Sequence, residues 1–141
     1  MSISDKLKTL IKSAWDDGVP CLVATQGPNG PNISPKGSML VFDDGHLAYW
    51  ERSKKQAPEN LGHDNRVCVM YSNFKAQRDG VLDSGFLRFY GTAQLYETGP
   101  VRDAIFKLLL PREQTHVGAD TGIGVLIRID HAADVRGKPL P

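Results

Sequence analysis

The sequence lacks a surplus of charge of either sign, and it lacks any long apolar run. Its 141 residues include 17 Lys and Arg against 16 Asp and Glu, which gives a formal net charge of +1. A chain whose positive and negative charges nearly balance offers no broad positive surface to nucleic acid or to an anionic membrane. No apolar run approaches the roughly 20 residues that cross a bilayer, and the N-terminus lacks a secretory signal pattern. We therefore expect a cytoplasmic protein with no nucleic-acid or membrane partner.

Cysteine and histidine are also scarce. Cys21 and Cys68 stand in apolar runs, which favours buried free thiols in a reducing compartment, although a disulfide stays open at this point. The glycine-rich stretch 118–124 precedes an expected strand and does not open a helix, so it is no dinucleotide-binding motif. The four histidines show no metal-ligand spacing, and we expect no metal site: His46, His63, His116 and His131.

What is present indicates one globular domain over residues 1–141, with 40% hydrophobic and 23% charged residues. Apolar residues three and four apart predict a helix over about 3–17, with Ser2 and Asp5 as a capping box and Gly18 as the stop. The polar, proline-rich tail, about 132–141, is expected to fray.

Strand patterns dominate the rest of the chain. Six runs are rich in β-branched and aromatic residues: 21–25, 32–42, 46–50, 66–74, 85–97 and 122–130. Gly91, inside the fifth run, is a candidate for a bulge or a close backbone approach. Helices are expected at 58–63 and at 98–110, the second capped by Thr98, with a polar loop at 75–84. Closely spaced strands with few helices favour a mainly β fold, a small closed or nearly closed antiparallel barrel.

Residues 49–55 (YWERSKK) form the most informative stretch. They place aromatics, cations and a hydroxyl at the end of an expected strand, directly before a helix. A phosphate monoester carries nearly two negative charges, which cations, hydroxyls and free helix N–H groups can share. Trp50 or Tyr49 could pack on a flat aromatic ligand. A solvated basic loop would have the same composition and remains the alternative.

A second stretch, 35–39 (PKGSM), lies in the strand expected beside the first stretch. Gly37 allows a ligand to approach the backbone closely. Lys36 could stabilise the negative charge that develops on a reduced flavin. A strand bend with a surface lysine is the alternative interpretation.

Taken in order, these stretches resemble the pyridoxamine 5'-phosphate oxidase-like, FMN-binding split-barrel family. The resemblance covers about residues 15–131 and includes Asn60-Leu61, Asn65-Arg66-Val67 and Gly91-Thr92-Ala93. It implies a six-stranded antiparallel split β-barrel with a few short helices, and FMN held between the subunits of a homodimer.

The resemblance also implies which residues bind the cofactor. Lys36, Gly37 and Ser38 would line the isoalloxazine and ribityl groups, Trp50, Glu51 and Arg52 would continue that wall, and Ser53, Lys54 and Lys55 would hold the phosphate, with Arg52 the strongest single candidate. The chain departs from the family pattern in two places. A lysine common in the family falls on Ala57 here, and the segment after Asp130 contains no tryptophan, which argues against oxidation of vitamin B6.

Two functions follow from this pattern. The first is an FMN-dependent oxidoreductase that passes electrons from reduced nicotinamide to a small acceptor such as flavin, quinone or oxygen, with the flavin carrying the chemistry. No side chain is identified as a general acid or base. The alternative is a non-catalytic binding module for FMN, haem or a deazaflavin, because the short C-terminal segment leaves few residues for a substrate pocket.

Overall fold

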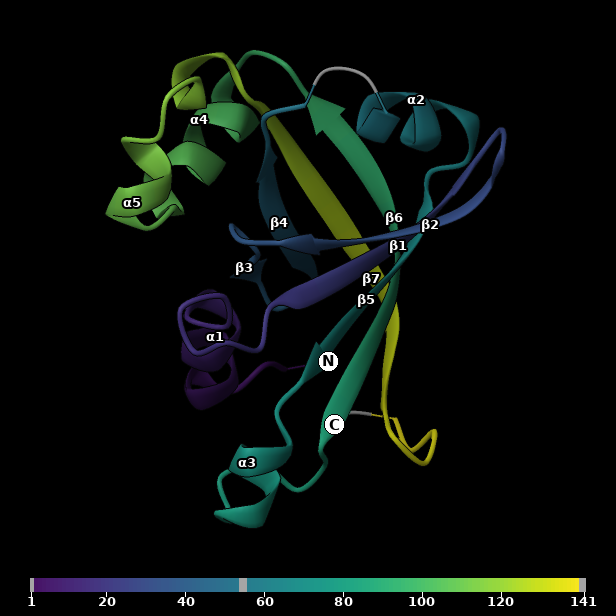
Figure 1. The fold of residues 1–141 in the computed structure, drawn as a ribbon, viewed down its shortest axis with the longest axis vertical. Helices are drawn as coiled ribbons and strands as arrows, with labels where there is room; N and C mark the ends of the chain where they lie inside the picture. Colours follow the sequence, from purple (N-terminus) through teal and green to yellow (C-terminus); the bar gives the residue numbers. More distant parts are fainter. Residues whose placement is uncertain (1, 54–55, 140–141) are drawn as a thin grey trace.

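The computed structural model describes residues 2–53 and 56–139 (Figure 1). Among these residues, seven antiparallel strands form one sheet in the order β2-β1-β5-β6-β7-β4-β3. The elements, in chain order, are α1 (Asp5–Lys12), β1 (Cys21–Gly27), β2 (Gly30–Lys36), β3 (Leu40–Asp43), β4 (His46–Glu51), α2 (Gln56–His63), β5 (Arg66–Ser72), α3 (Phe74–Arg78), β6 (Phe86–Tyr96), α4 (Pro100–Leu108), α5 (Pro111–Gln114), the 3-10 helix η1 (Ala119–Thr121) and β7 (Ile123–Asp134).

The mainly β, antiparallel split-barrel fold predicted from the sequence is confirmed, with one strand more than expected. The expected strand 32–42 breaks into β2 and β3, because the chain turns at Gly37 and Ser38. A Cβ on Gly37 would lie 3.2 Å from both the Trp15 ring and the Glu113 carboxylate, so the backbone at this turn is closely covered. The turn takes the chain from one edge of the sheet to the other.

Several predicted boundaries were wrong. The first helix is shorter than 3–17, and its N-cap is Ser4, whose hydroxyl accepts the Leu7 N–H at 3.1 Å, so no Ser2–Asp5 capping box forms. Gly99 precedes α4 as its N-cap in place of Thr98, because Pro100 fixes the first helical position.

The loop expected at 75–84 and the tail expected from 132 are partly structured. The side chain of Asn73 caps the short helix α3 by accepting the Ala76 N–H at 2.9 Å. Strand β7 continues to Asp134, because β6 extends far enough to pair with it, with Leu87 opposite Asp134. The described part of the expected frayed tail, residues 132–139, is thus the end of β7 followed by a turn whose Pro139 bridges to Ala133.

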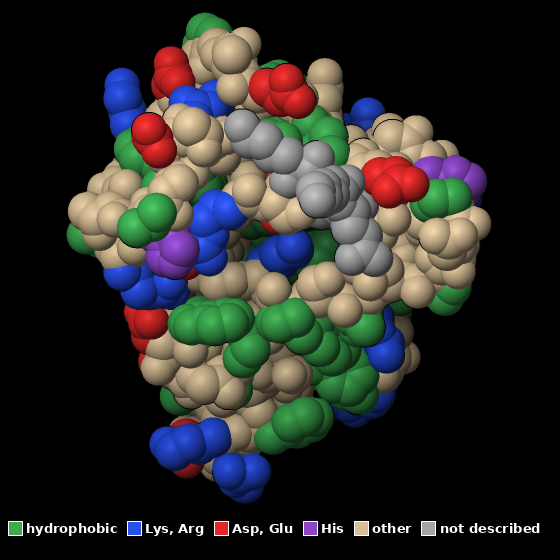
Figure 2. All heavy atoms as spheres, turned by 45° about the horizontal axis from the view of Figure 1, so that its top comes forward, with side chains coloured by type: hydrophobic (Ala, Val, Ile, Leu, Met, Phe, Trp, Pro, Cys, Tyr) green, Lys and Arg blue, Asp and Glu red, His purple; other side chains and the backbone are tan. Residues whose placement is uncertain are grey.

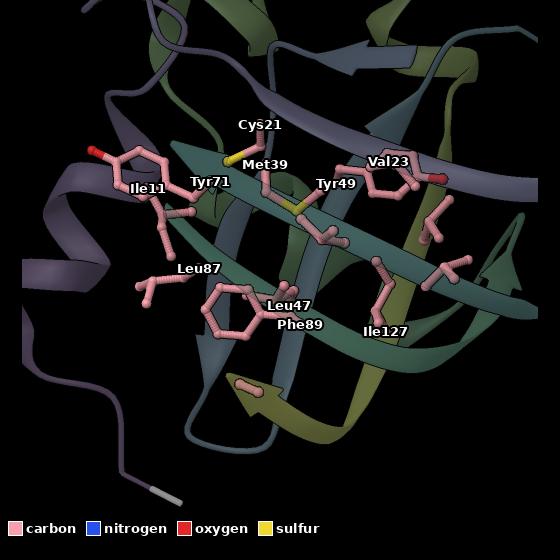
Figure 3. Close-up of a cluster of buried hydrophobic side chains, with 14 of the residues drawn as sticks. Ile11, Cys21, Val23, Met39, Leu47, Tyr49, Tyr71, Leu87, Phe89 and Ile127 are labelled. Carbon is pink, nitrogen blue, oxygen red and sulfur yellow. The ribbon is translucent and has the colours of Figure 1, made fainter. Parts of the chain in front are cut away.

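The main core fills the inside of the curved sheet, where α1 covers it (Figures 1 and 3). Ile11, Leu47, Phe89 and Ile127 are at most 2% exposed and come from four different elements. Full burial of such a side chain contributes about 1.5–3 kcal/mol. This packing fixes the curvature that brings the two sheet edges toward each other.

A second, smaller core lies between β4 and helix α4. It contains Leu40, Ala48, Trp50, Ile105 and Leu109, all buried. Strand β4 is therefore buried on both faces, since Leu47 and Tyr49 point into the main core. No helix of the described chain is both long and apolar enough for a membrane span.

Gly91 lies beside a β-bulge, as its place in the sequence suggested, and the extra residue of that bulge is Asp130 of β7. The register between β6 and β7 shifts between Tyr90 and Gly91. A Cβ at Gly91 would lie 2.3 Å from the carbonyl oxygen of Arg128. The two strands can approach this closely only because residue 91 has no side chain.

Candidate functional site

The edge strand β2 turns a polar row toward the inside of the barrel. Asn32, Ser34 and Lys36 are half-buried, and they alternate with exposed residues such as Ile33 and Pro35. A strand that only closed a core would present apolar side chains inward. These three face a pocket of about 210 Å³ whose other walls come from β1, β4, the segment after β4 and α2.

An ion pair crosses this pocket. The Lys36 Nζ lies 2.9 Å from Glu51 Oε2, and the two side chains are 17% and 8% exposed. In the described sheet no backbone pairing joins β2 to β4, so the ion pair connects the two sides of the split. The same ammonium lies 5.3 Å from the centre of the Tyr49 ring. Burial, together with the charge of Glu51, raises the pKa of the Tyr49 phenol, which therefore stays protonated.

Glu51 also holds the segment that follows β4. Its second oxygen, Oε1, accepts the backbone N–H of Ser53 at 2.9 Å. The side chain of Arg52, between them in the chain, is exposed, and it is not among the described residues that line the pocket. One carboxylate therefore fixes both the lysine of β2 and the start of the cationic segment before α2.

The side chain of Ser38 is hydrogen-bonded to the backbone of Trp50. The Ser38 hydroxyl accepts the Trp50 N–H at 2.9 Å and lies 3.2 Å from the Trp50 carbonyl oxygen, to which it donates. The Trp50 indole points to the other face of β4, where its N–H donates to the Ala119 carbonyl at 2.8 Å. Its ring packs against Phe106 and Arg102. Within one chain, Tyr49 and not Trp50 faces the pocket.

An arginine that sequence reasoning missed holds the turn at Gly37. The Arg112 guanidinium donates to the Gly37 carbonyl at 3.0 Å and lies 2.9 Å from Asp16. It also pairs with Glu113, whose side chain is 7% exposed. Arg112 thus joins α5, the segment after α1 and the turn that carries Lys36.

The Asn60 side chain, 5% exposed, supports the pocket from α2. Its amide lies 3.3 Å from the Thr25 hydroxyl, and a Cβ on Gly27 would be 2.2 Å from its oxygen. In the sequence Asn60 stood out only as part of a motif, and its place against the β1–β2 hairpin gives that motif a structural role.

Of the nine residues predicted to bind the cofactor, seven lie in described parts of the chain. Lys36, Glu51 and Ser53 meet at the pocket. Gly37 and Ser38 form the adjoining turn, Arg52 is exposed and does not line the pocket, and Trp50 points to the other face of β4. Lys54 and Lys55 lie outside the described residues.

A larger cavity, about 610 Å³, lies where α4 meets η1. Its charged walls include Glu97, Asp103 and Asp120, which disfavour a phosphate. The one arginine there, Arg102, already donates to the carbonyls of Gly122 and Asp120. Among the residues placed in the structure, no group of three or more His, Cys, Asp or Glu side chains could hold a metal.

Comparison with known proteins identifies the family of this fold and site. Residues 5–121 match the family model described as pyridoxamine 5'-phosphate oxidase. The chain belongs to this family. No curated protein sequence matches the chain.

Solved structures of other proteins have the same fold. HupZ from Group A Streptococcus is 26% identical, with a TM-score of 0.72 and 99% of each chain covered. An FMN-binding protein from Syntrophomonas wolfei is 14% identical, with a TM-score of 0.63 and coverage of 92% of this chain and 86% of that chain. An F420 reductase is 13% identical, with a TM-score of 0.62 and coverage of 93% and 98%.

The pocket has the right chemistry for part of FMN. Thr25, Asn32 and Ser34 supply hydroxyl and amide groups that suit a polyhydroxyl chain. Its volume of about 210 Å³ is below the roughly 300–1,000 Å³ of complete ligand sites. One chain therefore encloses only part of such a ligand.

Proposed function

We propose that this protein is an FMN-binding flavoprotein of the cytoplasm that passes electrons from reduced nicotinamide to a small acceptor such as flavin, quinone or oxygen. The observation that carries the proposal is the polar pocket in which Lys36 and Glu51 meet, lined also by Ser53 just before α2. Membership of the pyridoxamine 5'-phosphate oxidase family supports it, as does the likeness to an FMN-binding protein.

In this proposal each part of the site has a role. The segment with Arg52, Ser53, Lys54 and Lys55 holds the phosphate, and the row on β2 receives the ribityl chain. Bound FMN would supply the hydride and electron chemistry. The residues of this chain bind and orient the cofactor, whereas the space beside Gly37 is filled by Trp15 and Glu113 of the same chain.

We further propose a homodimer that completes the site. The outer face of β1 and β5 carries half-buried apolar side chains at Leu22, Ala24, Cys68 and Met70, and Ile33 on β2 is 64% exposed. Figure 2 shows a band of apolar side chains beside a hollow flanked by lysine and arginine side chains. A second copy covering this face would enclose the part of FMN that one chain leaves open.

The decisive experiment is reconstitution. The purified protein is mixed with FMN, excess FMN is removed by gel filtration, and the absorbance of the protein peak is recorded. Flavin bands that co-elute at dimer size support the proposal. A colourless protein would refute the FMN assignment and direct the search to haem and deazaflavin ligands.

The alternative, a binding module without turnover, is tested on the same sample. Reduced nicotinamide is added without oxygen, and the flavin absorbance near its visible maximum is followed. Rapid bleaching supports an oxidoreductase. A flavin that dithionite reduces but nicotinamide does not would favour the binding module.

A further inference from the structure

Glu51 lines the pocket and also controls the charge that the pocket presents to a ligand. Its side chain is 8% exposed, and each carboxylate oxygen has its own partner: Lys36 Nζ at 2.9 Å and the Ser53 N–H at 2.9 Å. Among the described residues that line the pocket, Lys36 and Glu51 are the only charged ones. The charge met by an incoming group is therefore set by this one pair.

The pair has no net charge. A lone ammonium in a half-buried pocket would attract anions strongly, because solvent and salt screen buried charges poorly. Paired with Glu51, the same ammonium offers a nearby anion little net attraction. The remaining polar walls, from Thr25, Asn32 and Ser34, are neutral hydroxyl and amide groups that suit an uncharged, hydroxylated ligand part.

We infer that Glu51 is a specificity-determining residue that neutralises Lys36, so that the inner pocket accepts uncharged, hydroxylated groups and disfavours anionic ones. A phosphate is thereby disfavoured in the inner pocket and left to the segment that begins at Arg52, where the proposed function places it. For FMN as the ligand, this inference rests on the proposed function. The neutralised pocket then favours the neutral oxidised flavin over the anionic reduced flavin.

The first test uses the protein without FMN, and inorganic phosphate is the probe. Phosphate affinity is measured by calorimetry for the wild type, Glu51→Gln, Lys36→Met and the double variant. The affinities should follow the net charge of the pair. Glu51→Gln binds phosphate at least about tenfold more tightly than the wild type, the double variant stays within about threefold of the wild type, and Lys36→Met binds most weakly.

The control is Asp130→Asn, which removes one negative charge from an exposed pair with Arg128. It should leave phosphate affinity unchanged. Unaltered affinity in Glu51→Gln, or a double variant as tight as Glu51→Gln, would overturn the inference. If the Glu51→Gln variant does not fold, the phosphate affinities of the wild type, Lys36→Met and the double variant still test the inference. Lys36→Met must then bind phosphate at least about tenfold more weakly than the wild type and the double variant.

The second test uses bound FMN. In Glu51→Gln the ratio of affinities for reduced and oxidised FMN should rise at least about tenfold, which raises the two-electron potential by about 30 mV. No rise in potential would overturn the inference while leaving FMN binding intact. A wild type that retains no FMN would refute the proposed function, and the order of phosphate affinities would still decide the role of Glu51.

Discussion

Arg112 offers the sharpest test of how the turn at Gly37 is held. Its guanidinium contacts three separate parts of the chain: the Gly37 carbonyl, Asp16 and Glu113. Replacement with Met keeps much of the side-chain length and removes all of these polar contacts. The carboxylate of Glu113, 7% exposed, would then be buried without its cation.

The expected loss of stability follows from the burial of Arg112 and Glu113. Breaking a fully buried ion pair by removing one partner costs about 3–5 kcal/mol. The Arg112 side chain is 35% exposed, so water already shares part of the interaction. We therefore expect Arg112→Met to lower the free energy of unfolding by about 2 kcal/mol, measured by guanidinium denaturation monitored by tryptophan fluorescence.

Two comparisons decide whether this reasoning holds. Arg128→Met breaks a pair whose side chains are 67% and 44% exposed, and it should cost less than about 1 kcal/mol. Adding Glu113→Gln to Arg112→Met removes the unpaired charge and should restore part of the lost stability. Equal losses in Arg112→Met and Arg128→Met would refute the role assigned to the buried carboxylate.

Three further predictions concern other parts of the molecule. Gly91→Ala places a methyl 2.3 Å from the Arg128 carbonyl and should lower the free energy of unfolding by about 3 kcal/mol, read from urea denaturation. Burial raises the pKa of Cys21 to about 12, so a thiol reagent at about pH 8 should modify Cys21 only when the protein unfolds. Arg52→Ala should weaken FMN binding by at least about 1.5 kcal/mol in a fluorescence titration, and unchanged affinity would show that the phosphate lies elsewhere.

The sequence predicted the strands well where local pattern and burial agree. In β4, Leu47 and Tyr49 alternate with Ala48 and Trp50, and β-forming side chains fill both faces because both are buried. The bulge beside Gly91 was predictable because a glycine inside a long strand usually marks a bulge or a close backbone approach. The helix ends were less predictable, since Ser2 and Ser4 are both suitable caps and only tertiary contacts decide between them.

The site was predictable in its residues and not in its contacts. Lys36 and Glu51 were both expected near the cofactor, yet their ion pair depends on how the sheet curves until β2 meets β4. Arg112 lies 75 residues from Gly37 in the chain, and no local pattern links the two. One signal was available: Asn32, Ser34 and Lys36 alternate with apolar residues in β2, which indicates a polar inner row on an edge strand.

The alternation of side chains along β4 explains why the pocket can be both polar and rigid. Trp50 is fixed on the outer face by its hydrogen bond to Ala119 and by packing against α4, so the strand cannot shift along its axis without breaking that packing. Glu51 follows Trp50 in β4, so its position is fixed by the same packing, and its side chain lies on the opposite face of the strand. From this position the buried carboxylate pairs with Lys36 at 2.9 Å, and loss of either partner would leave a buried charge unpaired. The second core therefore supports the candidate site, although none of its side chains lines the pocket.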